Sequence, residues 1–170
     1  SERFPTGITL DPHPAPAARR GALPIVFGEP LVRHIYTADP SAHVFDGRVY
    51  IYPSHDIDTG VPPNDQGDHF DMVDYHVLSF ADFDGPVVDH GAVLHVKDVP
   101  WAKKQLWAPD AAYRDGTYYL FFPAKDHAGV FRIGVATSSR PAGPFVARPE
   151  PIPGSYSIDL PNGGVGVIRN

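Results

Sequence analysis

Proline occupies 20 of the 170 positions, which is roughly every eighth residue. A proline inside a helix removes a backbone hydrogen bond and costs about 3 kcal/mol, so the chain cannot sustain long helices. Aromatic residues make up 12% of the chain, and aromatic side chains favour strands. Together these features predict an all-β fold of many short strands separated by tight turns.

The charge balance argues against several classes of partner. The chain has 14 Lys and Arg against 20 Asp and Glu, and its longest basic runs are Arg19–Arg20 and Lys103–Lys104. A nucleic-acid partner needs a basic surface, and a membrane span needs about 20 consecutive apolar residues. The sequence has neither, and without Cys it has no disulfide or thiolate chemistry. We therefore expect no nucleic-acid and no membrane partner.

The first 30 residues differ in composition from the rest. Residues 1–30 are rich in Pro and Ala, and Pro24 interrupts the short apolar stretch Ala22–Phe27. We interpret 1–30 as an extended N-terminal arm and not as a signal peptide. This interpretation leaves the localisation open.

An internal repeat lies in the middle of the chain. The segments Ala42–Pro53 (AHVFDGRVYIYP) and Ala112–Pro123 (AYRDGTYYLFFP) each place an Asp-Gly pair between a short strand and an alternating aromatic strand. Asp-Gly is the strongest local hairpin signal, because both central residues of a type I′ turn need a positive φ. The sequence therefore predicts two hairpins, with turns at Asp46-Gly47 and Asp115-Gly116.

The similarity of the two segments continues downstream of the hairpins. Gly85–Val88 resembles Gly143–Val146, and each closes a unit after one more strand, Asp74–Phe80 or Phe131–Ser138. A unit of about 50–70 residues with four short strands has the size of a propeller blade with its loops. A β-sandwich with two similar hairpins is the alternative that the pattern alone leaves open.

An aspartate precedes each hairpin. Asp39 and Asp110 occupy equivalent positions, and Asp159 begins a third copy. The innermost strands of propeller blades line one central channel, so these aspartates would converge despite their distance in sequence. Glycoside hydrolysis uses a pair of carboxylates, and this pair would lie near aromatic side chains. Asp39 precedes Pro40, and Asp-Pro also opens ordinary turns, so a purely structural role is the alternative for this residue.

Five short segments carry a resemblance to a known family: His34–Phe45, Arg48–Asp56, Trp107–Asp110, Ser139–Phe145 and Ser157–Asp159. In this order they resemble the five-bladed β-propellers of glycoside hydrolase family 43, the arabinofuranosidases and β-xylosidases. The resemblance implies a partial five-bladed propeller in which only about two blades and the start of a third are present.

The resemblance also divides the chain. It implies a partial propeller domain at 31–159, with blade one at about 36–100 and blade two at about 107–153. The start of blade three falls at 155–159, and an atypical tail follows at 160–170. The tail has no aromatic and no acidic residue, and we interpret it as the product of a frameshift or a truncation.

The resemblance assigns roles to individual residues. Asp39 corresponds to the family's general base, and Asp159 to the residue that tunes the pKa and orientation of the general acid. Trp107 is expected to stack on a sugar ring, and Asp110 to contact the substrate or hold its loop. His55 ends the first aromatic strand and is expected to reach the same pocket.

The general acid of the family is a glutamate that follows the third aspartate. The chain has three glutamates, Glu2, Glu29 and Glu150, and none follows Asp159. The acid is therefore expected outside this chain. The implied function is an inverting glycosidase of arabinofuranosyl or xylosyl linkages in plant polysaccharides. The alternative is a catalytically inactive carbohydrate-binding remnant, and open blade edges are expected to promote self-association.

An acidic stretch with histidines follows the first aromatic strand. Its spacing lacks the regular oxygen ligands and terminal Glu of a calcium loop, so we interpret it as a solvated insertion. No cofactor is expected to be required, although relatives with a central cation leave calcium open. A metal-dependent hydrolase is a third alternative that rests on this stretch alone. Its residues are His55, Asp56, Asp58, Asp65, Asp68, His69 and Asp71.

Overall fold

The computed structural model describes residues 30–65, 67–154, 156–159 and 165–168, the last two ranges as backbone only. It contains eleven strands and a single short 3₁₀ turn in this part of the chain. The expected N-terminal arm at 1–30 lies, apart from Pro30, outside the described residues. No helix in the described ranges is long and apolar enough to cross a membrane.

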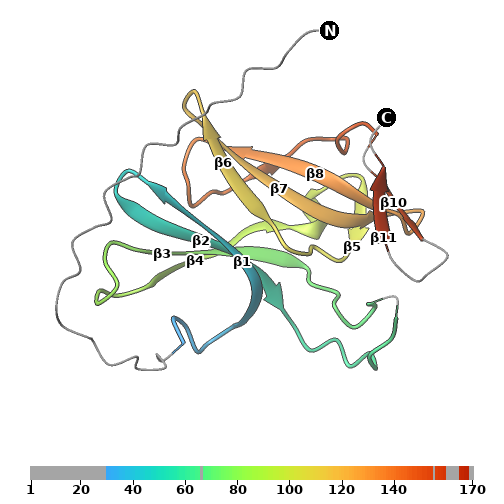
Figure 1. Cartoon of the computed structure of the whole chain (residues 1–170), viewed down its shortest axis with the longest axis horizontal. Helices are drawn as coiled ribbons and strands as arrows, with labels where there is room; N and C mark the ends of the chain where they lie inside the picture. The colour runs from blue at the N-terminus through green and yellow to red at the C-terminus, as the bar shows by residue number, and fades with distance from the viewer. Residues whose placement is uncertain (1–29, 66, 155, 160–164, 169–170) are drawn as a thin grey trace, which may run out of the picture. The chain divides into compact units, whose positions relative to one another are not determined.

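The first sheet is an antiparallel meander of four strands that pair in chain order (Figure 1). Its strands are β1 (Tyr36–Phe45), β2 (Arg48–Asp56), β3 (Asp74–Phe80) and β4 (Val88–His95). A meander in which every strand neighbours the next is the arrangement of a propeller blade, whereas the sandwich alternative typically uses Greek-key connections. This sheet falls within the segment expected to form blade one, and it is called blade one below; the second sheet is called blade two.

The second sheet has the same plan with one extra short strand. In order along the sheet, β5, β7, β8 and β9 are neighbours, and β6 also pairs with β7. A 3₁₀ turn at Val96–Asp98 leads from the first sheet into it. The strands are β5 (Ala102–Lys104), β6 (Asp110–Arg114), β7 (Thr117–Asp126), β8 (Phe131–Ser138) and β9 (Val146–Ala147).

Both predicted hairpins are present. Phe45 pairs with Arg48 across the first turn, and Arg114 with Thr117 across the second. The intervening Asp-Gly residues all have positive φ, with values of 52° and 74° in the first turn and 49° and 81° in the second. The Asp-Gly pair therefore recurs in both segments because a two-residue hairpin turn requires a positive φ at both central residues.

A third pair of strands follows the second sheet. β10 (Tyr156–Asp159) pairs antiparallel with β11 (Val165–Ile168). β10 coincides with the expected start of blade three, and part of the tail at 160–170 forms its partner strand.

Aromatic side chains fill the space between the two blades. Tyr52 and Tyr75 of blade one are about 1% exposed, and Phe122 of blade two is equally buried. The rings of Tyr75 and Phe122 are 6.0 Å apart, and Trp101 stacks on Phe122 at the same distance. Each fully buried side chain of this size contributes about 1.5–3 kcal/mol. The blades therefore form one continuous core.

Hydrogen bonds tie the blades together around this core. The Tyr52 hydroxyl donates to the Pro141 carbonyl at 2.7 Å, and the Phe145 amide donates to the Val93 carbonyl at 2.9 Å. Both bonds join blade one to the segment that closes blade two. The relative position of the two sheets is thus fixed by directional contacts as well as by burial.

We predict that Gly134→Ala destabilises the interface between the blades. A Cβ at this position would lie 2.7 Å from Trp101 Cζ2 and closer still to Phe122, and both rings are buried. Overpacking of this kind costs about 1–3 kcal/mol. Chemical denaturation should show that loss, whereas Ala112→Val, at an exposed position in β6, should change the unfolding free energy by less than about 0.5 kcal/mol.

Candidate active site

A cavity of about 320 Å³ lies where the two blades meet near the start of β1. It brings together two of the residues singled out from the sequence, Asp39 and Trp107. Its wall is otherwise mostly apolar, with one further carboxylate. The lining residues are Ala38, Asp39, Asp56, Phe70, Met72, Trp107, Ala108 and Pro123.

Asp39 occupies an irregular position in β1. The register with β2 shifts between Ala38 and Ser41, and Asp39 has a φ of 46°. Aspartate is one of the few residues besides glycine that visit this left-handed region, and bulges next to active sites re-aim side chains. Asp39 is exposed and lines the cavity, so the bulge presents a solvated carboxylate to it.

Asp56 supplies the second carboxylate of the cavity. It lies opposite Tyr36 in the β1–β2 register, and Ser54 Oγ donates to Asp56 Oδ1 at 3.1 Å. Sequence reasoning placed Asp56 in the acidic stretch but not among the site residues. The signal that could have found it is strand alternation, because Asp56 lies on the same face of β2 as Ser54 and Tyr52.

Trp107 is held in place from several directions. Its indole Nε1 donates to the Phe70 carbonyl at 2.8 Å, and its ring centroid lies 4.2 Å from that of Phe131. The buried Tyr75 hydroxyl donates to the Trp107 carbonyl. A ring fixed in this way loses little freedom on binding, which is what an aromatic stacking surface requires.

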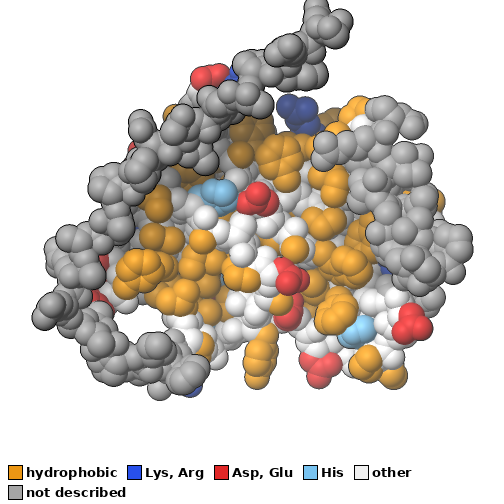
Figure 2. Space-filling model, viewed as in Figure 1, with side chains coloured by type: hydrophobic (Ala, Val, Ile, Leu, Met, Phe, Trp, Pro, Cys, Tyr) orange, Lys and Arg blue, Asp and Glu red, His pale blue; other side chains and the backbone are white. Residues whose placement is uncertain are grey.

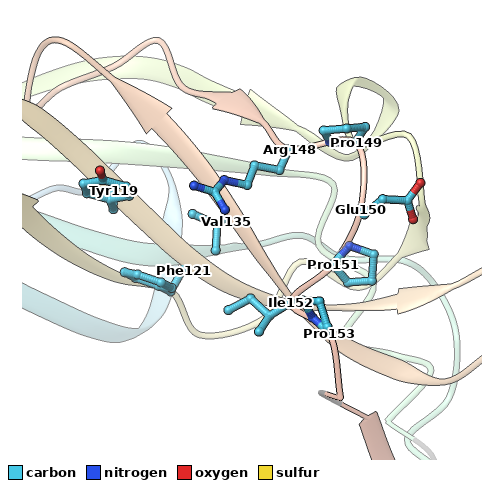
Figure 3. Close-up of a pocket in the computed structure, with 9 residues that line it drawn as sticks. All are labelled: Tyr119, Phe121, Val135, Arg148, Pro149, Glu150, Pro151, Ile152 and Pro153. Atoms are coloured by element: carbon cyan, nitrogen blue, oxygen red, sulfur yellow. The ribbon is translucent and has the colours of Figure 1, made fainter.

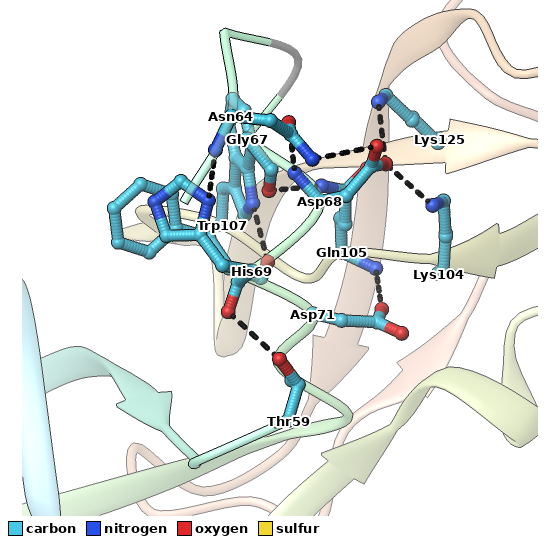
Figure 4. A network of polar contacts seen from close by, with 11 residues as sticks. Thr59, Asn64, Gly67, Asp68, His69, Asp71, Lys104, Gln105, Trp107 and Lys125 are labelled. Carbon is cyan, nitrogen blue, oxygen red and sulfur yellow. Dashed lines mark hydrogen bonds and ion pairs between the residues drawn. The ribbon is translucent and has the colours of Figure 1, made fainter. Parts of the chain in front are cut away.

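Residues 57–73 connect β2 to β3 and cross to blade two (Figure 4). Lys104 Nζ lies 2.9 Å from Asp68 Oδ1, and the Lys104 hydrogen bond is the main reason that the pKa of Asp68 is lowered. The side-chain amide of Gln105 donates to the Gly67 carbonyl at 2.7 Å, and the backbone amide of Gln105 donates to Asp71 Oδ1 at 3.1 Å. The stretch interpreted as a solvated insertion is therefore anchored on the neighbouring blade.

This anchoring also bears on calcium. Asp68 and Asp71 are engaged by Lys104 and Gln105, and Asp58 Oδ1 accepts from the Gly60 amide at 2.9 Å. Each of these three carboxylates therefore has a partner within the chain. The expectation that no cofactor is required, with calcium left open, stays untested.

Phe70 belongs to the cavity, although no sequence motif pointed to it. Its side chain is 49% exposed and lines the cavity, and its carbonyl holds the Trp107 indole. Its position follows from the contacts of residues 57–73 with blade two. Contacts of this kind are not readable from local sequence.

Asp110 does not line this cavity. It joins the innermost strands of the two blades, because His43 Nε2 lies 2.7 Å from Asp110 Oδ1. Partial burial raises the pKa of Asp110, but hydrogen bonds from His43 and the Ala111 amide outweigh it and lower the pKa. The contact is therefore stabilising above the ordinary pKa of 3.8 and is lost as the pH falls below it.

The other two expected site residues are His55 and Asp159. His55 is not among the lining residues of the cavity, and its Nδ1 lies 2.5 Å from Asp74 Oδ1. Asp159 is the last residue of β10, and its side chain lies outside the described part of the chain. A substrate contact of His55 and a pKa-tuning role of Asp159 both stay predictions.

A larger cavity, of about 580 Å³, lies on blade two (Figure 3). Tyr119 and Phe121 from β7 and Val135 from β8 face the segment 148–153 across it. Its one acidic residue is Glu150, which is also the only glutamate among the described residues. Hydrolysis of a glycosidic bond uses a pair of carboxylates, which this cavity lacks. The smaller cavity, with Asp39 and Asp56, is therefore the better candidate for the active site.

The chain is thus built of consecutive blade-like sheets, with two carboxylates and a fixed indole on one cavity. The sequence profile described as Glycosyl hydrolases family 43 matches residues 37–160. The chain therefore belongs to glycoside hydrolase family 43, as the sequence motifs indicated.

Two curated relatives show the extent of the match. The chain is 64% identical over 132 residues to xylosidase/arabinosidase 43A of Humicola insolens. It is 55% identical over 130 residues to a xylosidase/arabinosidase of Bacteroides ovatus. Each alignment covers 76% of this chain and 40% of the relative, so the chain spans about two fifths of their length.

Solved structures match in the same way. CoXyl43, a β-xylosidase/α-arabinofuranosidase from a compost metagenome in complex with xylotriose, superposes with a TM-score of 0.74 at 65% identity. That match covers 81% of this chain and 43% of the other. A Xanthomonas citri enzyme complexed with xylotriose gives 0.69 at 63%, covering 77% and 37%. The prediction of a partial propeller is thereby confirmed.

We predict that Gly67→Ala disturbs Trp107. Gly67 has a φ of 68°, and a Cβ there would lie 3.0 Å from Trp107 Cζ2. Gly60 lies in the same segment at a φ of 67°, with nothing within 4 Å of such a Cβ. Both alanine variants carry the backbone strain, about 1–2 kcal/mol, but only Gly67→Ala should shift tryptophan emission and increase its acrylamide quenching. Equal spectra for the two variants would contradict the contact.

Proposed function

We propose that the chain supplies two blades, and the catalytic base, of an inverting glycoside hydrolase. The observation that carries this proposal is the shared cavity of Asp39 and Trp107 at the meeting point of the blades. Membership of family 43 supports it, since the resemblance of the sequence motifs assigns Asp39 as the family's base.

In the proposed reaction Asp39 accepts a proton from water, which attacks the anomeric carbon from the side opposite the leaving group. A carboxylic acid about 6.5–9.5 Å away protonates the leaving oxygen, and the configuration inverts. The proposal assigns no residue of this chain as that acid, and it assigns Asp159 to hold the acid protonated. Trp107 provides the stacking surface for a sugar ring, with the exposed Phe70 ring on the same cavity.

The proposed substrates are xylosyl and arabinofuranosyl linkages. Curated relatives are named xylosidase/arabinosidase, and solved relatives hold xylotriose. An apolar wall with two carboxylates suits a pentose, which carries ring carbon faces for stacking and hydroxyls for hydrogen bonding.

A second candidate function is carbohydrate binding without hydrolysis. The observation that favours it concerns the acid: Glu150, the one described glutamate, lines a different cavity from Asp39. In that case the chain would hold a sugar on Trp107 without cleaving it.

Aryl xyloside and aryl arabinofuranoside distinguish the two functions. We expect Asp39→Asn to lower nitrophenol release at least about 100-fold, the usual contribution of a general base. Asp58→Asn, which changes an exposed carboxylate away from the cavity, should leave the rate unchanged. An equal rate in the Asp39 variant would refute its role.

If the chain releases no nitrophenol, xylotriose binding decides between the remaining outcomes. Binding that weakens in Trp107→Ala supports the carbohydrate-binding function. If the chain does not bind xylotriose at all, both the hydrolase proposal and the carbohydrate-binding proposal are wrong for the chain on its own. The gene read beyond codon 159 in all three frames would then show whether an acid-bearing blade follows.

We also propose that the chain self-associates through its apolar surfaces. Hydrophobic side chains cover much of the face shown in Figure 2. Val146 on the short outer strand β9 is 71% exposed, and Phe121 in the cavity on blade two is 36% exposed. Sedimentation velocity should show species that grow with protein concentration, and Phe121→Lys should reduce them. A monomer at every concentration would overturn this proposal.

A further inference from the structure

Three side chains of blade one form a cluster outside the cavity of Asp39. His55 comes from β2, and Asp74 and His76 come from β3. One potential ligand atom from each residue lies within 4.8 Å of the other two. The two imidazole centroids are 4.5 Å apart, and all three side chains are less than one fifth exposed.

The strand register explains why these residues meet. β2 and β3 pair from Val49 opposite Phe80 to Ile51 opposite Leu78. Continued in the same register, His55 falls opposite Asp74, and His76 lies on the same face two residues further along β3. The pairing of β2 with β3 ends at Ile51 opposite Leu78. The cluster therefore lies beyond the paired part of the two strands, next to residues 57–73.

A second carboxylate supports His76. Asp89 of β4 lies 2.9 Å from His76 Nδ1, accepts from the Gly91 amide at 2.8 Å, and lies 2.6 Å from His34 Nε2. A carboxylate that accepts the proton on one ring nitrogen leaves the lone pair of the other available. This is the usual support of a metal-binding histidine.

Asp89 orients the His76 ring through the contact with Nδ1 at 2.9 Å, and Asp89 is itself held by the Gly91 amide and His34. This carboxylate belongs to the support of the cluster and is not one of its three candidate ligands.

We propose that His55, Asp74 and His76 bind a transition-metal ion of the Zn²⁺ class. Two imidazoles with one carboxylate suit Zn²⁺, Ni²⁺ or Co²⁺, whereas Ca²⁺ and Mg²⁺ prefer sets of oxygen ligands. Bonds of about 2.0–2.2 Å separate tetrahedral ligands by roughly 3.4 Å. His55 and Asp74 would move apart from their 2.5 Å contact, and His76 would turn toward them.

The bound ion would join the two ends of residues 57–73. His55 precedes this segment and Asp74 follows it, so a metal bond between them closes it at its base. The segment carries Phe70, which lines the cavity, and Asp68, which pairs with blade two. The role of the ion is therefore structural, and the proposal does not depend on the enzyme's reaction.

Equilibrium dialysis of the tag-free 170-residue chain against Zn²⁺, with metal quantification, tests the site. We expect about one ion per chain, a thermal midpoint that rises by several degrees, and at least tenfold weaker binding in His76→Ala and His55→Ala. His127→Ala, at an exposed position in the β7–β8 turn, should bind as the unchanged chain does. The far-ultraviolet circular dichroism of each variant confirms its fold.

Co²⁺ gives a second readout that does not depend on affinity. The intense visible bands of four-coordinate Co²⁺ should appear in the unchanged chain and in His127→Ala, and be absent in His76→Ala. Binding that the three variants share equally would identify an adventitious ion and overturn the proposal. No stoichiometric binding of Zn²⁺, or equal affinity for Ca²⁺, would overturn it as well.

Discussion

The aromatic interface between the two blades is the contact on which the other features depend. Tyr75 takes part in it twice, because its ring packs near Phe122 and its hydroxyl binds the Trp107 carbonyl. The same buried side chain thus belongs to the core and orients the cavity wall. A buried hydroxyl without a partner is costly, so the carbonyl of Trp107 is held at its position by the energetics of the core.

The site combines this rigid support with a local irregularity. Asp39 leaves the regular pairing of β1 at a bulge and adopts a left-handed backbone, while Trp107 is fixed by three neighbours. A strained aspartate persists only where the surrounding structure determines its conformation. Here the flanking residues of β1 pair with β2 on both sides of the bulge, and β2 is part of the core. The irregular backbone is thereby confined to the residues that face the cavity.

Sequence reasoning succeeded where the determinants are local. The Asp-Gly turns and the alternating aromatic strands fix both hairpins with little outside help, and the ordered motifs identify the family. It failed where position depends on distant contacts. The short strand Ala102–Lys104 joins the second sheet, and Phe70 reaches the cavity, because of pairing and ion contacts with residues far along the chain. The alternation of side chains along β2 could have identified Asp56. His55 and Asp110 each lie in a sequence motif with a residue that lines the cavity, yet neither lines the cavity itself.

The crossing of residues 57–73 from blade one to blade two has a consequence for how such enzymes diversify. The segment that carries Phe70 connects two strands of blade one and is held by Lys104 and Gln105 at the start of blade two. An exchange of either blade alone between relatives would therefore separate this segment from the residues that hold it. The cavity lined by Asp39 and Trp107 therefore depends on both blades, and a change in the length of this segment would also change its contacts with blade two.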